Sequence, residues 1–384
     1  MKRYIPAWQG LGPLDLVRRP PAPCFPFGAP RATGFYVARN AIHHLFRLLG
    51  YADGSTVLMP SYHSGNEVAA VRATGADVRF YSVDRRFGID LEEIERLVRE
   101  GAKALYVIHY LGWTQPMEEL RRICGERGLL LVEDCALSLY AERDGRPAGS
   151  FGDFSVFCLY KTLPVPSGGL LVENTMSLPG LDGLAFRSVG RLSTLARAAD
   201  LVLERLRLRS NLAGGAAMGL KRAVGAALNA LRVERVPVGD MAFDSSRADL
   251  DLPPFVRGLA ARFDGREIRR RRRENFRLLR DLLEGKVPLL DLDLEEGTCP
   301  LFFPILVEDK DVAARELARR GICSMKFWNQ GDPAAGPAEF PDTHFLRRHL
   351  LELPIHQDLG PPQMEYVARH VAALRFRIEA SCVR

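Results

Sequence analysis

Two residues that each follow an apolar run could carry covalent chemistry on a carbonyl compound. Asp134 follows the run at 129–133, and Lys161 follows a second run at 154–159. A lysine at the end of a buried strand loses part of its hydration, which favours the neutral, nucleophilic amine that forms Schiff bases. A carboxylate at the carboxyl edge of an α/β sheet lies where such sheets bind ligands, and it can pair with a protonated ring nitrogen.

Each of these two residues also has a simpler explanation when it is taken alone. Asp134 could cap a helix or lie in a surface loop, and Lys161 could be an exposed residue at a strand end. Their combination favours the chemical interpretation, because both follow strands that are close in sequence and Gly168-Gly169 comes soon after.

A third group of residues could bind a phosphate. Arg39, Asn40 and Ala41 stand at the start of a predicted helix over residues 41–49. The N-terminus of a helix presents free backbone N–H groups and a favourable dipole, and Arg39 would add a fixed charge. A simple asparagine cap explains Asn40 equally well on local grounds.

The elements that must position these residues follow from the hydrophobic pattern. Short apolar runs alternate with amphipathic stretches over residues 35–172, which predicts an α/β fold with a mostly parallel sheet and helices on both faces. The predicted strands are 56–59, 78–82, 104–108, 129–133, 154–159 and 169–172. The predicted helices between them are 66–74, 91–99 and 117–127.

The rest of the chain divides into an N-terminal arm, an insertion and a smaller unit. We expect an arm at 1–34, a large domain at 35–285 and a small C-terminal αβ domain at 286–384. Leu, Ala and Arg dominate an inserted helical segment at about 175–244. The further elements predicted are helices at 192–208, 218–231, 259–283, 310–320 and 362–376, and a strand at 301–307. In the helix at 259–283, apolar Ile268, Phe276, Leu279 and Leu283 should face a core while the five arginines at 269–273 stay in water.

Composition limits the classes of function. The chain has 384 residues, a net charge of +6, and seven cysteines that form no CxxC pair or Cys/His cluster, so we predict no metal site. It has neither a signal-like apolar run nor a stretch long enough to span a membrane, so we expect a cytoplasmic protein. The arginine run lacks a nucleic-acid-binding motif, so no nucleic acid is expected. Residues 191–235 could instead touch an anionic membrane surface.

The segment 129–169 resembles the DegT/DnrJ/StrS family of sugar aminotransferases, which are fold-type I enzymes dependent on pyridoxal 5′-phosphate (PLP). The family's pattern appears here as Glu133-Asp134-Cys135-Ala136, Gly152-Asp153, Phe157-Cys158, Lys161 and Gly168-Gly169. Segments before and after it resemble the family in the same order, apart from the insertion. The resemblance implies that Lys161 forms the Schiff base with PLP and that Asp134 holds its pyridine nitrogen.

The resemblance also implies the reaction and the partners. An amino group would pass from a small-molecule donor, glutamate in the family, to a nucleotide-linked keto-sugar for polysaccharide, cell-surface glycan or natural-product synthesis, in a homodimer. Related dehydratases carry histidine in place of the lysine, so Lys161 indicates transamination.

Three positions depart from the family pattern. Cys158 stands where the family has a phosphate-binding serine, and Leu137 where it has a polar contact to the cofactor. The ring-stacking aromatic aligns with Ser64, which leaves Tyr62 or His63 as candidates for that contact. The alternative to an enzyme is therefore a catalytically divergent member that binds sugar nucleotides or a membrane surface.

Overall fold

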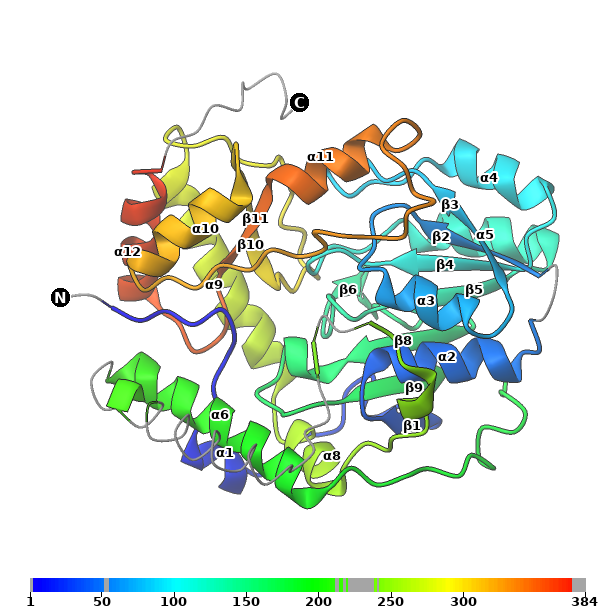
Figure 1. Cartoon of the computed structure of the whole chain (residues 1–384), viewed down its shortest axis with the longest axis horizontal. Helices are drawn as coiled ribbons and strands as arrows, with labels where there is room; N and C mark the ends of the chain where they lie inside the picture. The colour runs from blue at the N-terminus through cyan, green and yellow to red at the C-terminus, as the bar shows by residue number, and fades with distance from the viewer. Residues whose placement is uncertain are drawn as a thin grey trace.

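The structure, a computed structural model, has a large sheet-based unit next to a smaller αβ unit (Figure 1). It describes residues 3–51, 55–210, 214–216, 219, 238–239 and 242–374. The helix predicted at 218–231 lies outside these residues, apart from residue 219. None of the helices in the described ranges is both long enough and apolar enough to cross a bilayer.

A seven-stranded sheet forms the large unit, in the order β1-β9-β8-β5-β4-β2-β3. Its strands are β1 (Ala32–Phe35), β2 (Thr56–Pro60), β3 (Asp77–Tyr81), β4 (Ala104–Ile108), β5 (Leu130–Asp134), β8 (Phe154–Cys158) and β9 (Gly169–Glu173). The strands from β3 to β8 pair in parallel, and β9 is antiparallel to both β8 and β1. The predicted mostly parallel α/β fold is confirmed. The edge strand β1 was not predicted, because a four-residue segment with a glycine carries little strand pattern.

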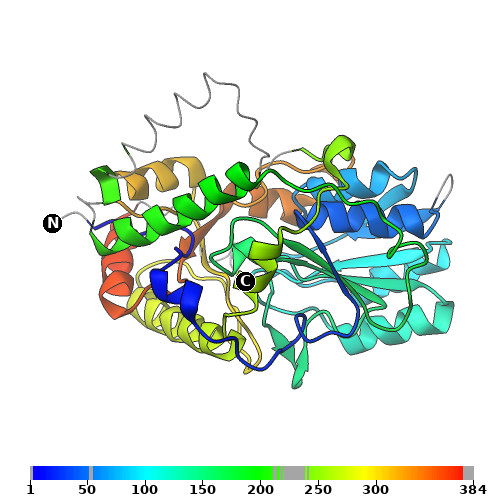
Figure 2. The ribbon, with the colours of Figure 1, turned by 90° about the horizontal axis from the view of Figure 1, so that it is seen from below.

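Helices cover both faces of this sheet (Figure 2). They are α2 (Ala38–Leu48) and α3 (Asn66–Arg72) on one face, and α4 (Leu91–Arg99) and α5 (Met117–Arg127) on the other. Helix α4 shows why the sequence folds this way. Asp90 accepts hydrogen bonds from the N–H groups of Glu92 and Glu93, and apolar residues at helical spacing are buried against the sheet.

The smaller unit is built on the antiparallel pair β10 (Phe302–Leu306) and β11 (Leu350–Pro354). Its helices are α9 (Gly265–Leu283), α10 (Lys310–Arg319), α11 (Pro341–His349) and α12 (Pro361–Val371). The long helix α6 (Arg191–Arg209) lies inside the predicted insertion. Short elements elsewhere are α1 (Pro13–Val17), β6 (Glu142–Arg143), β7 (Arg146–Pro147), η1 (Leu159–Lys161), η2 (Ser245–Arg247) and α8 (Pro254–Ala260). The apolar core of this unit includes Ile5 from the N-terminal arm, which bridges to Ile322.

The helix predicted at 259–283 is two helices, α8 and α9, because Asp264 caps a new start by accepting from the N–H groups of Arg266 and Glu267. The apolar side of α9 is buried as predicted. It packs on both units, since Ile268 joins the core beneath the large sheet and Leu279 joins the core of the small unit. The domain boundary at residue 285 therefore stays a prediction.

The prediction that all five arginines face water is wrong for Arg272 and Arg273. The Arg272 side chain is 1% exposed and donates to the carbonyls of Pro300 and Leu301 and to the side chains of Gln9 and Gln357. Burial lowers its pKa to about 10, so the guanidinium remains charged at neutral pH. These acceptors come from distant segments, so the helical pattern alone did not reveal the site.

Gly169 controls how closely α2 approaches the sheet. A Cβ on this residue would lie 2.5 Å from the backbone nitrogen of Ala38 and from the carbonyl carbon of Val37. Backbone atoms cannot swing aside as a side chain can, so the start of α2 lies against β9 only because residue 169 is a glycine.

We predict that Gly169→Ala lowers the free energy of unfolding by about 1–3 kcal/mol, because the helix start must move to accommodate the methyl group. Thermal or urea unfolding measures this change. Gly125→Ala in α5 is the matched control, since a Cβ there meets no atom within 4 Å and alanine favours the helix. Equal stability of the two variants would contradict the predicted contact.

Candidate active site

A pocket of about 580 Å³, including its open mouth, lies where β5 and β8 end and α2 begins. Both Asp134 and Lys161 line it. The parallel pairing of β5 with β8 explains this arrangement, because Asp134 lies opposite Val156 and both strands end at the same edge of the sheet. The structure thus brings together the two residues on which the predicted chemistry depends.

Asp134 is a buried carboxylate whose own hydrogen bonds orient it. Its Oδ2 accepts from the hydroxyl of Tyr106 at 2.6 Å, and its Oδ1 accepts from the N–H of Ala136 at 2.8 Å. Burial raises the pKa of Asp134, and the nearby carboxylate of Glu67 raises it further, while Tyr106, Ala136 and Lys161 act in the opposite direction. A cation bound in the pocket would offset the desolvation of Asp134.

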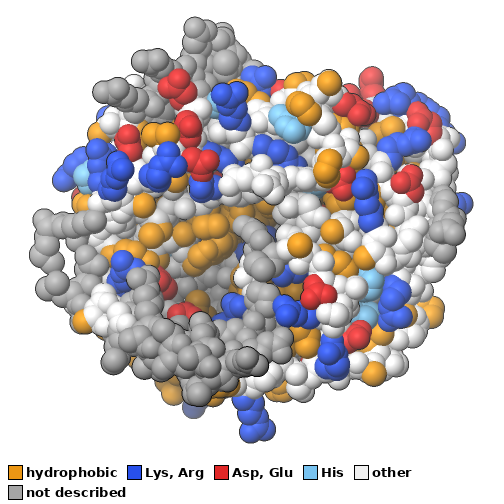
Figure 3. Space-filling model, in the orientation of Figure 1, with side chains coloured by type: hydrophobic (Ala, Val, Ile, Leu, Met, Phe, Trp, Pro, Cys, Tyr) orange, Lys and Arg blue, Asp and Glu red, His pale blue; other side chains and the backbone are white. Residues whose placement is uncertain are grey.

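Lys161 ends the short helix η1, directly after β8. The turn is held by the N–H of Leu159, which donates to the carbonyl of Gly168 at 2.9 Å. The Lys161 side chain is half-buried, and its Nζ lies 5.7 Å from the centre of the Phe327 ring. It also lines a neighbouring cleft of about 1350 Å³, again including open space, between the N-terminal arm and α6. Figure 3 shows a hollow with hydrophobic side chains on this side of the molecule.

The start of α2 faces the pocket, and of the three residues predicted there only Arg39 lies on the wall. Ala38 and Arg39 line the pocket, and Val37 at the helix start makes no side-chain cap. Arg39 also donates to the carbonyl of Gly239 at 2.9 Å. The backbone N–H groups of this first turn and the Arg39 guanidinium are suited to a phosphate.

Asn40 and Ala41 do not line this pocket. Asn40 is buried, and its side-chain amide donates to the carbonyl of Arg247 at 2.9 Å, so it ties α2 to a distant segment. Ala41 is fully buried in the core of the large unit. The pocket-facing part of the helix start is therefore 37–39.

Tyr62 and His63, predicted as ring-stacking candidates, also lie outside the lining of the pocket. The His63 ring stacks on Phe80 with centres 5.1 Å apart, and burial lowers the pKa of His63 to about 3. Tyr62 packs edge-on against Trp328 at 4.8 Å. Ser64 is the residue of this segment that reaches the pocket wall.

Trp328, the tryptophan that lines this pocket, was not predicted from the sequence. It belongs to the loop between α10 and α11 of the smaller unit, far along the chain from β5 and β8. No local spacing connects it to Asp134 or Lys161, so only the packing of the two units places it here.

The two other departures from the family pattern also lie on the pocket wall. Cys158 and Leu137 both line it. Burial raises the pKa of the Cys158 thiol, and the charge of Lys161 lowers it. Cys158 therefore offers a weak hydrogen-bond donor at the position where the family pattern has serine.

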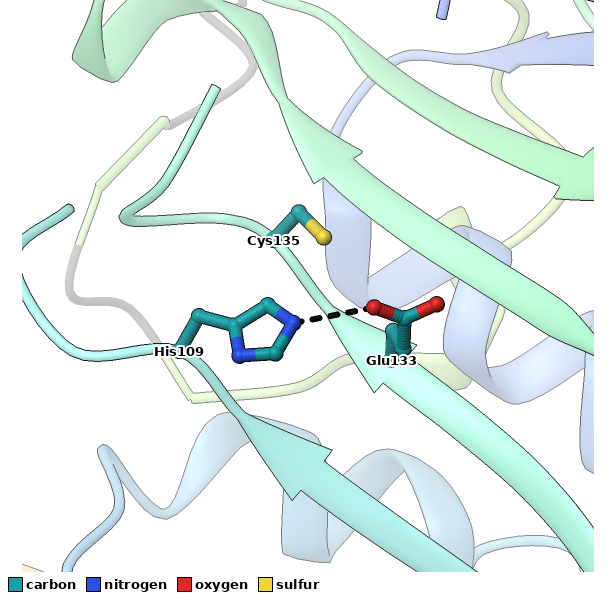
Figure 4. Close-up of side chains that lie close together, drawn as sticks. All are labelled: His109, Glu133 and Cys135. Carbon is teal, nitrogen blue, oxygen red and sulfur yellow. Dashed lines mark hydrogen bonds and ion pairs between the residues drawn. The ribbon is translucent and has the colours of Figure 1, made fainter. Parts of the chain in front are cut away.

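His109, Glu133 and Cys135 lie close together and resemble a set of metal ligands (Figure 4). The donors and acceptors of His109 and Glu133 are used by the protein. The N–H of Gln115 donates to Nδ1 of His109, so the ring proton lies on Nε2 and is donated to Glu133 at 3.0 Å. Burial raises the pKa of Cys135, which keeps it a thiol. His109 and Glu133 are therefore best explained as a hydrogen-bonded structural support, in which Glu133 is adjacent in sequence to Asp134.

Glu133 anchors the turn that leads into β8. Besides His109, it accepts from the backbone N–H groups of Gly149, Phe151 and Gly152 at 2.6–2.8 Å. Four donors around one fully buried carboxylate offset the loss of its hydration. Glu133 and Asp134 are neighbours in sequence, and Glu133 supports the strand end that carries Asp134.

We predict that Glu133→Gln lowers the free energy of unfolding by about 3 kcal/mol or more. The NH₂ group that replaces one carboxylate oxygen would face backbone N–H donors, and the side chain would lose two acceptor sites. Urea unfolding measures the change. Glu126→Gln, at an exposed site on α5, should change stability by less than about 0.5 kcal/mol. A Glu133→Gln protein as stable as this control would show that the four hydrogen bonds matter little.

Comparison with known proteins supports the family resemblance. The family model described as the DegT/DnrJ/EryC1/StrS aminotransferase family matches residues 27–181, which include β1 to β9 and both Asp134 and Lys161. The resemblance predicted from the sequence is confirmed over this part of the chain.

Two curated relatives and one solved structure illustrate the similarity. GDP-perosamine synthase from Vibrio cholerae is 30% identical over 138 residues, covering 35% of this chain and 38% of the relative. The dTDP-3-amino-3,4,6-trideoxy-alpha-D-glucose transaminase from Micromonospora megalomicea subsp. nigra is 32% identical over 151 residues, covering 38% and 40%. The matches thus span about two fifths of these relatives. PseC from Helicobacter pylori, an aminotransferase involved in the biosynthesis of pseudoaminic acid, has the same fold, with a TM-score of 0.67, 16% identity and coverage of 96% and 98%.

Proposed function

We propose that this chain is a PLP-dependent aminotransferase that transfers an amino group to a nucleotide-linked keto-sugar. The observation that carries the proposal is that Asp134 and Lys161, on neighbouring strand ends, line one pocket at the start of α2. The match of residues 27–181 to an aminotransferase family supports it.

The residues of the pocket fit PLP. Asp134 supplies a buried carboxylate for the pyridine nitrogen, and a protonated nitrogen would offset the repulsion between Asp134 and Glu67. The first turn of α2 and the guanidinium of Arg39 supply N–H groups and charge for the phosphate. Lys161 supplies the amine for the aldehyde.

When bound, PLP supplies an electron sink that stabilises negative charge on a substrate carbon. Asp134 keeps the proton on the pyridine nitrogen, and Tyr106 and Ala136 hold the carboxylate in place for this. The Nζ of Lys161 would be the base that removes the proton from the substrate carbon and holds it for return. The half-buried position of Lys161 between the pocket and the neighbouring cleft allows contact with a substrate that enters from that cleft.

The acceptor class is inferred from the relatives, whose names include a GDP-perosamine synthase and a dTDP-sugar transaminase. Glutamate as amino donor, a homodimer, a cytoplasmic location and a role in polysaccharide or related sugar synthesis belong to the same proposal and rest on the family resemblance. Contact of residues 191–235 with a membrane surface is a weaker proposal. Only α6 and parts of the remaining segment are described, and Leu192 and Leu195 on α6 are exposed.

A protein that binds sugar nucleotides without turnover is the second candidate. Cys158 and Leu137 favour it, because they face the pocket where the family pattern has polar contacts to the cofactor. The two candidates differ in a measurable way, since only the enzyme must bind PLP covalently.

We predict that borohydride reduction of the PLP-loaded protein leaves a phosphopyridoxyl group on Lys161, because this amine lies beside the carboxylate that would hold the ring. Peptide mass spectrometry locates the modified residue. Lys161→Arg should lose the label, while Lys286→Arg, at an exposed site on the small unit, should retain it. An unmodified Lys161 after reduction of loaded wild-type protein would refute the proposed enzyme and favour the binding protein.

We predict that Asp134→Asn folds but loses about 100-fold or more in kcat, because loss of a buried charge pair costs about 3 kcal/mol or more. This loss is measured as the rate of amine transfer from glutamate to a panel of nucleotide keto-sugars, which is monitored through the absorption spectrum of the cofactor. Circular dichroism checks that the variant is folded. Unchanged turnover in a folded Asp134→Asn protein would mean that the carboxylate does not hold the ring nitrogen.

A further inference from the structure

The segment before α3 brings no aromatic ring to the pocket. Ser64 is the residue that reaches the wall, and its hydroxyl and backbone N–H both donate to the carboxylate of Glu67. The aromatic side chains before it, Tyr62 and His63, are buried elsewhere. A planar cofactor ring held by Asp134 would therefore lack an aromatic partner from this segment.

A loop of the smaller unit packs over this same segment. Arg347 donates to the carbonyl of Ser61 at 3.2 Å, and Arg72 of α3 forms an ion pair with Asp332 at 3.1 Å. A Cβ on Gly65 would come within 3.8 Å of the backbone of Gly331, so the two backbones run close together. The loop at 328–332 thus lies beside Ser64.

Trp328 begins this loop, and its ring is fixed by an aromatic cluster. It contacts Tyr62 at 4.8 Å and 66°, and Tyr110 at 5.6 Å and 72°, which are edge-to-face arrangements. The residue is 7% exposed and lines the same pocket as Asp134 and Lys161. A rigid, nearly buried tryptophan therefore forms part of the wall on the side where Ser64 lies.

The backbone of Trp328 is held in an unfavourable conformation. Its φ of 54° lies in the left-handed region, which costs a bulky residue free energy unless the surroundings impose it. Arg347 imposes it by donating to the carbonyls of Trp328 and Gln330, both at 2.7 Å. Placing this ring at the pocket is a specific feature of the fold.

Phe327, the preceding residue, is held by two buried ionisable groups of the smaller unit. Its N–H donates to the side-chain oxygen Oε2 of Glu352 at 3.2 Å, and its carbonyl accepts from Nζ of Lys310 at 3.2 Å. Its ring lies toward Lys161 in the neighbouring cleft. The smaller unit therefore sets the positions of two consecutive aromatic rings near the reactive lysine.

We propose that Trp328 supplies the aromatic wall for the cofactor ring, in the role that Ser64 cannot fill. The inference rests on the proposed function, since it concerns the same pocket and PLP. It assigns a cofactor-positioning residue to the smaller unit. Tight cofactor binding would then require the loop at 328–332 to be packed in its position beside Ser64. If Trp328 were only a packing residue, its replacement would lower stability without a selective effect on PLP affinity.

The first experiment compares PLP affinity across variants by equilibrium titration. Trp328→Phe should keep the Kd within about threefold, because it retains an aromatic face, whereas Trp328→Leu should raise the Kd about tenfold. Trp113→Leu is the control. Trp113 packs against Phe276 at 5.4 Å, outside the pocket, so the variant should keep the wild-type Kd.

Labelling of Lys161 by borohydride separates the two hypotheses. A wild-type protein that cannot be labelled would overturn both the proposed function and the role of Trp328. A labelled Trp328→Leu protein with wild-type affinity would overturn the role of Trp328 alone. Compensation gives a further test, because Ser64→Tyr added to Trp328→Leu should recover affinity if an aromatic face is what was lost.

A second measurement does not depend on the stability of Trp328→Leu. The chain has three tryptophans, so Trp8→Phe/Trp113→Phe leaves Trp328 as the sole emitter. Its fluorescence should be quenched more strongly by reductively bound PLP than that of a protein whose sole tryptophan is Trp113. Equal quenching at equal loading would show that Trp328 does not contact the cofactor.

Discussion

Parallel pairing between β5 and β8 brings the ends of two buried strands to one edge of the sheet, and the rest of the pocket is arranged around that edge. Backbone hydrogen bonds fix Asp134 opposite Val156, while η1 turns the chain so that Lys161 faces the same space. Gly169 on the next strand lets α2 lie directly against the sheet, which brings the first turn of the helix to the pocket. A shift of β8 by one residue would turn its side chains to the other face and separate the pair.

The buried charges near this edge are stabilised in different ways, and the difference indicates their roles. Glu133 is surrounded by four donors and Arg272 by acceptors from distant segments, so both are satisfied by the protein itself. Asp134 has two donors and shares its pocket with the like charge of Glu67, and burial raises its pKa. A buried carboxylate whose charge is incompletely balanced beside an amine is typical of a functional site, whereas a saturated one is typical of a structural support.

The smaller unit contributes a residue to the wall of the pocket. Its loop after β10 and α10 brings Trp328 to the wall, and Arg347 holds that loop in place. The N-terminal arm ties the two units together, since Ile5 enters the core of the smaller unit and the amide of Gln9 donates to the carbonyl of Tyr160 next to Lys161. Groups that are far apart in the chain thus determine the shape of the space around the reactive amine.

The sequence by itself determined six of the seven strands of the large sheet, their order along the chain and the pair Asp134 and Lys161, because apolar runs and the residues that end them are local signals that burial in a parallel sheet makes strong. Only the tertiary structure decided which neighbours of these residues face the pocket. Asn40 was a reasonable phosphate ligand from its position at a helix start, yet a carbonyl 207 residues away holds its amide elsewhere. Arg272 looked like a solvated charge, and Trp328 gave no local signal. Their positions depend on contacts between distant segments, and hydrophobic periodicity carries no record of such contacts.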